Sequence, residues 1–185
     1  LLLAKYALTT KVPAIFPAIF GKFFSNYVNF YASLFNNSDN KRVQEVFSSM
    51  LNFSCALALM IISGLHLILP SFVGFWVGED LLLEQYYLII VLLITFLKLI
   101  ITSCGIILQA SGKFGLTPIV SAFEILTLIV FHYLLIDTKA AIFHLMLATS
   151  IVSGSITYVT AKKAAGVPLT EPILSLKFYF QAVLA

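Results

Sequence analysis

Three ionisable side chains lie deep inside long apolar runs of this chain, where they could bind an anion or carry a proton. Lys22 and Lys98 each lie about ten residues from both ends of their runs, which is roughly 15 Å of depth in a helix that rises 1.5 Å per residue. Glu124 also lies well inside its run. Charges at mid-bilayer cost about 2.5–3.5 kcal/mol on insertion scales and usually face an interior or a cavity. Two lysines against one glutamate leave one positive charge uncompensated, which favours an anionic ligand.

Both lysines belong to polar stripes with helical spacing. The first run has Lys22, Asn26, Asn29, Ser33 and Asn36, and the third has Thr95, Lys98, Thr102, Gly105 and Gln109, at intervals of three and four residues. We therefore predict that Lys22, Asn26, Asn29, Lys98 and Thr102 bind substrate. Glu124 is predicted to couple transport to an ion or to form a structural ion pair. The alternative is that Lys22 or Lys98 pairs with Glu124 and only holds helices together.

Two further stripes allow a simpler interpretation. The second run begins a polar face with Ser48, Asn52 and Cys55, and the fifth carries Ser150, Ser153, Thr157 and Thr160. Small polar residues let helices in a membrane approach one another closely. For these two runs, helix packing is the favoured interpretation.

The elements that must position these residues are predicted to be transmembrane helices. The chain is 61% hydrophobic and only 10% charged, whereas soluble domains are about 45–50% apolar and about 25% charged. Five runs approach the roughly 20 residues that a span needs: 12–35, 47–72, 86–108, 116–136 and 140–161. Lipid leaves no water for unpaired backbone groups, so each run is expected to be helical. The fold class is thus an all-α polytopic membrane protein with about five transmembrane helices plus the start of a sixth.

Prolines and the chain ends refine this organisation. Pro13 and Pro17 are expected near the start of the first helix, Pro118 in the first turn of the fourth, and Pro70 at the end of the second. Residues 1–163 are predicted to form the transmembrane bundle, and 164–185 a linker and the start of a further helix. Because the sequence begins without Met and stops inside an apolar segment, we expect it to be part of a longer protein.

Basic residues in the connections predict the orientation. If 36–42 is cytoplasmic, the inner side carries more Lys and Arg than the outer side, as the positive-inside rule requires. The inner residues are Lys41, Arg42, Lys113, Lys162, Lys163 and Lys177, and the outer ones are Lys5, Lys11 and Lys139. The loop 78–84 is then outside and 109–115 inside.

Other chemistries receive little support from the residues. His66, His132 and His144 lack metal-site spacing, and Cys55 and Cys104 have the apolar surroundings of core cysteines. Phosphate-loop, nucleophile-elbow and zinc-protease motifs are not found, and the basic residues are spread over several loops. We expect no catalytic residues, no metal, no cofactor and no nucleic-acid partner.

Three motifs, taken in order, resemble polysaccharide flippases of the O-antigen type. The stretch "LTTKVPAIFPAIFGKFFSNYVNFYASLFNNSDNKRVQEVF" resembles a helix, a short cytoplasmic loop and the next helix of those proteins. "LPSFVGFWVGEDLLL" is similar to their outer connection, and "GIILQASGKFGLTPIV" to a short inner connection with a Gly-Lys turn. The resemblance covers roughly residues 6–163.

The resemblance implies a place in the multidrug/oligosaccharidyl-lipid/polysaccharide exporter superfamily. It implies a two-lobed transporter with a central cavity and alternating access, of which this chain is most of the C-terminal lobe. The implied partners are a missing N-terminal lobe of the same protein, membrane lipid, and an undecaprenyl-pyrophosphate-linked oligosaccharide in a bacterial inner membrane. The family has no signature lysine at either position, so the roles of Lys22 and Lys98 rest on depth and stripe. A drug–cation antiporter of the same superfamily, or a membrane-embedded enzyme or scaffold that uses the histidines, remain alternatives.

Overall fold

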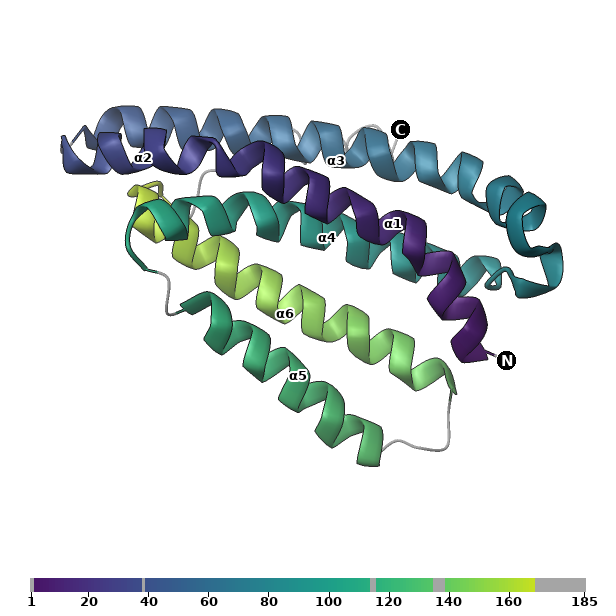
Figure 1. Ribbon diagram of the computed structural model, residues 1–185. Helices are drawn as coiled ribbons and strands as arrows, with labels where there is room; N and C mark the ends of the chain where they lie inside the picture. The colour runs from purple at the N-terminus through teal and green to yellow at the C-terminus, as the bar shows by residue number, and fades with distance from the viewer. Residues whose placement is uncertain (1, 38, 114–115, 135–138, 169–185) are drawn as a thin grey trace.

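A computed structural model describes residues 2–37, 39–113, 116–134 and 139–168, and the regular structure in these ranges is helical (Figure 1). Six α-helices and one short 3-10 turn, η1, follow one another along the chain. Their bounds are α1 Leu2–Ser25, α2 Tyr27–Asn36, α3 Asn40–Val77, η1 Glu79–Leu81, α4 Gln85–Ala110, α5 Leu116–Leu134 and α6 Lys139–Ala165. The all-helical fold expected from the apolar runs is confirmed.

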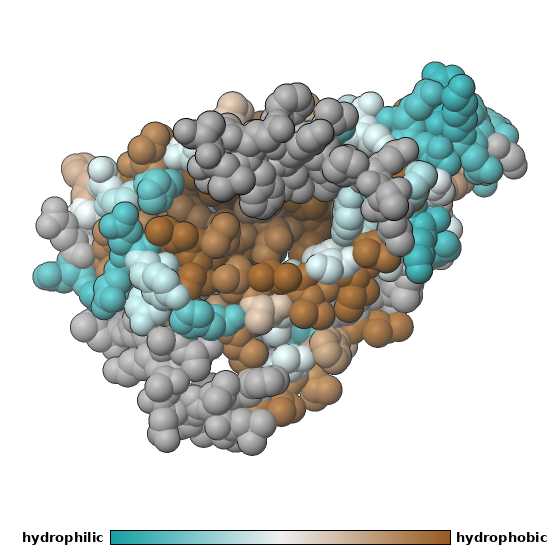
Figure 2. All heavy atoms as spheres, turned by 180° about the vertical axis from the view of Figure 1, so that it is seen from behind, coloured by the Kyte–Doolittle hydropathy of each residue, from teal (hydrophilic) through white to brown (hydrophobic). Residues whose placement is uncertain are grey.

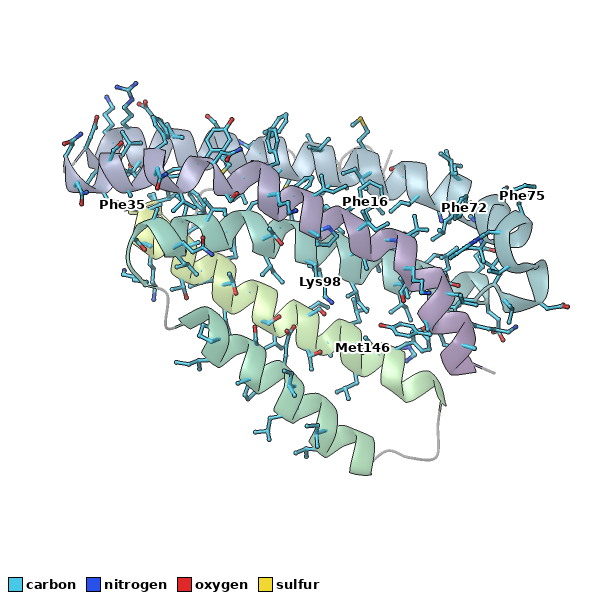
Figure 3. All side chains as sticks on the ribbon, in the orientation of Figure 1. Phe16, Phe35, Phe72, Phe75, Lys98 and Met146 are labelled. Carbon is cyan, nitrogen blue, oxygen red and sulfur yellow. The ribbon has the colours of Figure 1, made fainter. Side chains whose placement is uncertain are left out.

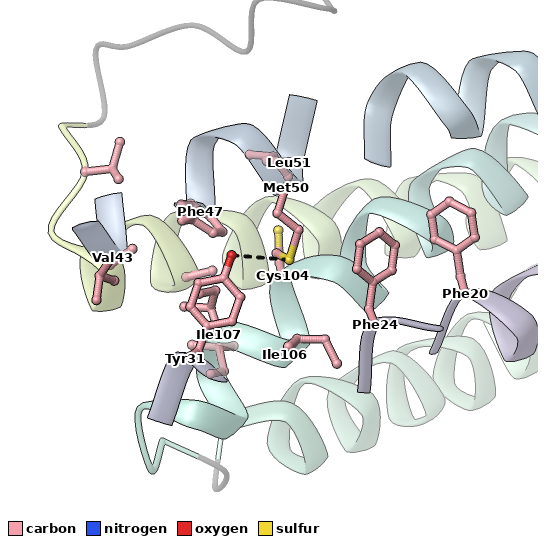
Figure 4. Close-up of a cluster of buried hydrophobic side chains, with 14 of the residues drawn as sticks. Phe20, Phe24, Tyr31, Val43, Phe47, Met50, Leu51, Cys104, Ile106 and Ile107 are labelled. Atoms are coloured by element: carbon pink, nitrogen blue, oxygen red, sulfur yellow. Dashed lines mark hydrogen bonds between the residues drawn. The ribbon is translucent and has the colours of Figure 1, made fainter. Parts of the chain in front are cut away.

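Helix α4 lies at the centre of the bundle. It packs against α1, α2, α3 and α6, whereas α5 packs against α6 at the edge (Figure 1). The main core forms where α2, α3 and α4 meet, and Tyr31, Phe47 and Ile107 are completely buried there (Figure 4). The Tyr31 hydroxyl contacts Met50 Sδ at 3.5 Å. This arrangement places any polar side chain of α4 next to several other helices.

Helix α3 is longer than the run that predicted it. Its first turn is capped by the Asp39 carboxylate, which accepts a hydrogen bond of 3.2 Å from the Arg42 backbone N–H. It ends at Gly78, whose φ of 98° suits glycine. The expectation that Pro70 ends the helix is wrong, because α3 continues through Pro70 to Val77. Helices in apolar surroundings tolerate proline where neighbours and local adjustment satisfy the freed backbone group.

The first predicted helix is wrong in its start and its continuity. Helix α1 already begins at Leu2, so Pro13 and Pro17 lie in its interior instead of near its start. The helical path is then interrupted at Asn26, and α2 carries the remainder of the run. The fourth helix agrees better with expectation, since Pro118 lies in the first turn of α5. Proline is tolerated there because the first N–H groups of a helix have no partner within it.

Three of the helices are long and apolar enough to cross a membrane: α3, α4 and the part of α6 from Phe143 to Ala165. Large apolar side chains are also exposed on the surface, among them Phe75 at 93% and Leu67 at 76%. Figure 2 shows apolar residues across the middle of one face and hydrophilic residues toward its two ends. These observations indicate a multi-pass membrane protein. That α1 with α2, and α5, also cross the membrane stays a prediction.

The connections alternate between the two ends of the bundle as expected. The turn between α2 and α3, the end of α4 and the end of α6 share one end, and the link between α3 and α4 lies at the other (Figure 1). A hydrogen bond of 2.7 Å from Gln44 Nε2 to the Gly166 carbonyl joins the start of α3 to the end of α6. Which end faces the cytoplasm stays a prediction. Most of 164–185, predicted to be a linker and the start of a further helix, lies outside the described residues.

Candidate functional site

Lys98 lies near the midpoint of α4, the central helix, and its side chain is exposed. It lines a cavity of about 150 Å³ between α1 and α4, together with Thr10, Pro13, Pro17 and Thr95. The remaining lining residues are Tyr6, Ala14, Val91 and Ile94. Figure 3 shows Lys98 extending from α4 into the region between α1 and α6. We call this cavity the Lys98 groove.

The two prolines in the α1 wall of the Lys98 groove leave backbone carbonyls of α1 without their usual helical donors. Because proline has no N–H, the carbonyls of Thr9 and Pro13 cannot receive the usual helical hydrogen bond from positions 13 and 17. In addition, the Thr9 hydroxyl oxygen is buried without a hydrogen-bond partner. Buried polar groups of this kind are normally satisfied by protein or ordered water. This part of α1 therefore offers hydrogen-bond acceptors that the helix itself does not use.

Two threonine hydroxyls complete the polar lining. Thr10 Oγ1 donates to the Tyr6 carbonyl at 2.7 Å, and Thr95 Oγ1 donates to the Val91 carbonyl at 2.8 Å. Since their hydrogens are used, both hydroxyl oxygens are left as acceptors. The Lys98 groove thus combines one ammonium group, which only donates, with several oxygen acceptors. A ligand that fits it carries both negative charge and hydroxyl or N–H donors.

The other predicted binding residues do not line this groove. Thr102 follows Lys98 by one turn, and its hydroxyl donates to the Lys98 carbonyl at 2.8 Å. A Cβ built on Gly21 would lie 3.6 Å from the Thr102 methyl group, so α1 and α4 are in close contact there. Lys22 is next to that contact, in the last turn of α1, and is exposed. That Lys22 and Lys98 share one ligand stays a prediction.

Asn26 and Asn29 lie further along the same path. Asn26 occupies the break between α1 and α2, with helical φ and ψ of −62° and −23° but no side-chain cap bond. Asn29 is in the first turn of α2, and both side chains are exposed. The stripe expected on one continuous helix is therefore divided between two helices. Their predicted contact with substrate stays a prediction.

Glu124 is half-buried, and Ser153 Oγ of α6 donates a hydrogen bond of 2.6 Å to its Oε1 atom. The polar residues of α6 on this side are buried hydroxyls: Thr149, Ser150, Ser153 and Thr157 are all at most 7% exposed. A carboxyl group at this depth requires a polar neighbour of this kind. A coupling role for Glu124 stays a prediction.

Lys98 and Glu124 lie at a similar depth in the bundle. A Cβ built on Gly154 would lie 3.3 Å from the Ile101 side chain, so α4 and α6 are in close contact at this pair. The two helices run in the same direction (Figure 1). Lys98 precedes Ile101 by three residues and Ser153 precedes Gly154 by one, so the depths of Lys98 and Ser153 differ by roughly 5 Å at most. We call Lys98, Ser153 and Glu124 the polar belt.

The histidines and cysteines form no comparable site in the part of the chain that the structure describes. Tyr86 Oη and His144 Nε2 are 2.6 Å apart and join the first turn of α4 to the second turn of α6. His66 is exposed on α3, and the side chain of His132 lies outside the described residues. Cys55 and Cys104 are buried, as expected for core thiols. In the ranges searched, no group of three His, Cys, Asp or Glu side chains could hold a metal ion.

The binding residues predicted from the sequence did not include those that α1 contributes to the Lys98 groove. Pro13 and Pro17 were expected near the start of a helix, Thr10 was not named, and Ser153 was placed in a stripe used for packing. A usable signal was present, because two prolines four residues apart leave two carbonyls on one helix face without donors.

No protein-family model, curated protein or solved structure matches this chain.

Proposed function

We propose that this chain forms part of a multi-pass membrane transporter that flips a lipid-linked, pyrophosphate-bearing oligosaccharide across a bacterial inner membrane by alternating access. The observation that carries the proposal is the exposed ammonium group of Lys98 at the midpoint of the central apolar helix. Charged residues at this depth mark substrate or ion pathways in membrane proteins. The family resemblance described above supplies the class of substrate.

The composition of the Lys98 groove supports this class of ligand. An ammonium group binds a phosphate oxygen through a charge-assisted hydrogen bond, which is stronger than a neutral one. The unused carbonyls of α1 and the lone pairs of Thr10 and Thr95 accept hydrogen bonds from sugar hydroxyls. The same set of groups would leave a purely apolar ligand with unsatisfied polar partners.

The size of the Lys98 groove supports binding of the head group there and not of a whole glycan. Its volume of about 150 Å³ is below the roughly 300–1,000 Å³ of drug-sized sites. It therefore suits a phosphate with an adjoining sugar hydroxyl and leaves the remaining glycan outside. The exposed Asn26 and Asn29 are candidates to contact that remainder.

A drug–cation antiporter of the same superfamily is the second candidate, and Glu124 is the observation that favours it. A cationic substrate needs an acidic partner, and this carboxyl group is only half-buried on α5. In that case loss of the carboxyl group, and not loss of Lys98, would abolish transport.

The test is glycan export in cells that lack the gene and are complemented with the full-length protein carrying Lys98→Arg or Lys98→Gln. We expect Lys98→Arg to keep part of the export and Lys98→Gln to remove most of it, because a charge-assisted contact contributes roughly 1.5–3 kcal/mol, or about ten- to a hundredfold in affinity. The same pair at Lys22 tests whether it shares the head group. Lys113→Gln, at an exposed position after α4, is the matched control and should export normally.

Membrane protein levels are measured for every variant. Full export by the Lys22→Gln/Lys98→Gln double variant would refute the binding of a pyrophosphate by these lysines. Loss of the protein from the membrane in both single variants would instead show that the lysines hold the bundle together. Loss of drug efflux in Glu124→Gln, with normal export in Lys98→Gln, would favour the antiporter.

A further inference from the structure

We propose that a groove between α2 and α3 binds a membrane phospholipid with an ethanolamine head group, whose phosphate contacts Arg42 and one of whose acyl chains lies in the groove. Two observations carry the proposal: an apolar groove on a membrane-spanning helix, and a set of opposite charges at the end of that groove. We call the cavity the α2–α3 groove. It shares no lining residue with the Lys98 groove and does not depend on the proposed transport.

The α2–α3 groove has a volume of about 250 Å³ and lies where the end of α1 and the start of α2 meet α3. Its buried lining residues, at most 8% exposed, are Phe24, Tyr31 and Met50. Its exposed aromatic residues, at least 42% exposed, are Phe23, Tyr27 and Phe53. Val46 and Ser49 complete the lining. Because the volume is below the roughly 300 Å³ of the smallest drug-sized sites, the groove suits part of one hydrocarbon chain.

Helix α4 shows at which level of the membrane the groove lies. Ser103 Oγ donates to Ser54 Oγ at 2.9 Å, so these residues of α4 and α3 are at the same level. The two helices run in opposite directions (Figure 1). Arg42 is twelve residues before Ser54, whereas α4 ends seven residues after Ser103. Arg42 therefore lies roughly 8 Å beyond the end of the apolar helix α4, which is the level expected for lipid head groups.

Arg42 and the α3 side of the groove lie on one helix face. Arg42, Val46, Ser49 and Phe53 follow one another at intervals of four, three and four residues. Val46 and Phe53 are roughly 6 and 16 Å further along α3 than Arg42. The groove thus occupies the depth of an acyl chain whose head group is at Arg42.

The Arg42 side chain is available to a ligand. It is exposed, and within the described ranges its guanidinium group forms no hydrogen bond or ion pair. Helical side chains lean toward the N-terminus of their helix, so this group extends into the head-group layer. A guanidinium group binds phosphate oxygens through two parallel charge-assisted hydrogen bonds.

The charges around Arg42 favour a head group that carries both signs. Asp39 and Glu45 precede and follow Arg42 by three residues, and both are exposed. Asp39 Oδ1 accepts a hydrogen bond of 3.2 Å from the Arg42 backbone N–H, and a carboxylate can accept several more. An ethanolamine ammonium group supplies such donors while the phosphate binds the guanidinium group. Choline has no N–H donor and a glycerol head group has no positive charge, so both fit less well.

The test is a lipid titration of the full-length protein in detergent, measured by native mass spectrometry. The probes are phosphatidylethanolamine, phosphatidylglycerol and phosphatidylcholine with identical acyl chains. We expect one phosphatidylethanolamine to bind roughly tenfold more tightly than either of the other lipids, the difference of about one charge-assisted contact. Tighter binding of phosphatidylglycerol would overturn the assignment of a zwitterionic head group. Equal binding of all three lipids would overturn the site.

Charge variants test the head-group contacts. Arg42→Gln should weaken the binding of all three lipids roughly tenfold or more. Lys41→Gln is the matched control, because it removes the same charge from the same turn, about 100° around the helix. Equal affinities of these two variants would overturn the role of Arg42. The double variant Asp39→Asn/Glu45→Gln keeps a helix cap, since Asn caps as well as Asp, and should lose the preference for phosphatidylethanolamine. A retained preference would overturn the role of the carboxylates.

A tryptophan variant tests the groove itself. Ser49→Trp fills the groove from an exposed position and should weaken phosphatidylethanolamine binding roughly tenfold. Leu67→Trp, 76% exposed on the same helix and outside the groove, is the control and should bind as wild type. Unchanged binding in Ser49→Trp would refute the seating of an acyl chain there.

A second measurement uses only the wild-type protein, so it does not depend on the folding of any variant. Phosphatidylethanolamine with a diazirine on one acyl chain is added to the full-length protein, and the photoproducts are mapped by mass spectrometry. We expect labels on the exposed aromatic residues of the groove, Phe23, Tyr27 and Phe53. Labels confined to other parts of the protein would overturn the inference.

Discussion

Ser153 of α6 donates a hydrogen bond of 2.6 Å to the carboxyl group of Glu124 on α5. This bond joins the helix at the edge of the bundle to the only helix against which it packs extensively among the described residues. It also fixes the Glu124 carboxyl group at the level of Lys98. The contact therefore attaches α5 to α6 through a polar pair inside the bundle.

Replacement of Ser153 by alanine should weaken the attachment of α5. The Glu124 carboxyl group would lose its donor while half-buried, and an unsatisfied polar group costs about 1–3 kcal/mol. Thermal unfolding of the purified protein in detergent measures the effect. Ser155→Ala, at an exposed position on the same helix, should change stability by less than about 0.5 kcal/mol. Equal stability of both variants would show that the bond contributes nothing to packing.

Gly154 permits the close approach of α4 and α6. A Cβ at this position would already lie 3.3 Å from Ile101 Cδ1, so Gly154→Leu should separate the helices and destabilise the protein by about 1–3 kcal/mol through overpacking. Gly105→Ala is the control on α4, because nothing lies within 4 Å of a Cβ built there. It should stabilise its helix by about 0.5–1 kcal/mol. Both changes are read from unfolding midpoints, and tolerance of Gly154→Leu would refute the close packing.

Pro17→Ala tests the polar wall of the Lys98 groove. Alanine restores the N–H that bonds the Pro13 carbonyl, so one acceptor is lost from the groove while the helix gains up to about 3 kcal/mol in propensity. We expect glycan export to fall although the protein remains at normal levels in the membrane. Ala18→Gly, at an exposed position of the same helix, controls for changes in the flexibility of α1. Normal export in Pro17→Ala would exclude the α1 carbonyls from ligand binding.

The orientation of the bundle is open to cysteine labelling. In a background in which Cys55 and Cys104 are replaced by alanine, Asp39→Cys and Lys113→Cys should react only with reagents that enter the cytoplasm. Asp80→Cys, between α3 and α4, should react from outside intact cells. These expectations follow from the excess of Lys and Arg at the end that contains residues 36–42. Labelling of Asp39→Cys from outside would reverse the orientation.

The sequence alone determined the kind of element and much of its placement. Apolar runs of membrane length permit only helices in lipid, and the regular structure of the described residues is helical. Alternation of the connections also followed from the order of the runs. Glu124 was recognisable because a carboxyl group inside an apolar run needs a polar partner, and Ser153 provides one.

Helix boundaries depended on contacts that a local pattern does not contain. Pro70 does not end α3, and α1 extends through two prolines from Leu2, as helices in apolar surroundings tolerate a missing N–H. Conversely, the polar stripe that includes Asn26 and Asn29 suggested a single helix, but the structure divides it at Asn26. Hydrophobic periodicity is nearly unchanged by such a break, so the sequence gives little sign of it.

Only the tertiary structure decided which polar residues meet. Spacing places Lys98 on one face of α4, but the helix that faces it is set by packing around that central helix. The contact of Gly21 with Thr102 and the approach of Gly154 to Ile101 fix α1 and α6 on either side of Lys98. The Lys98 groove is therefore lined by Pro13 and Pro17, and the carboxyl group level with Lys98 is held by Ser153. Such pairings depend on how side chains from distant parts of the chain pack together. Periodicity predicts which face of a helix is polar, but it does not predict which other helix packs against that face.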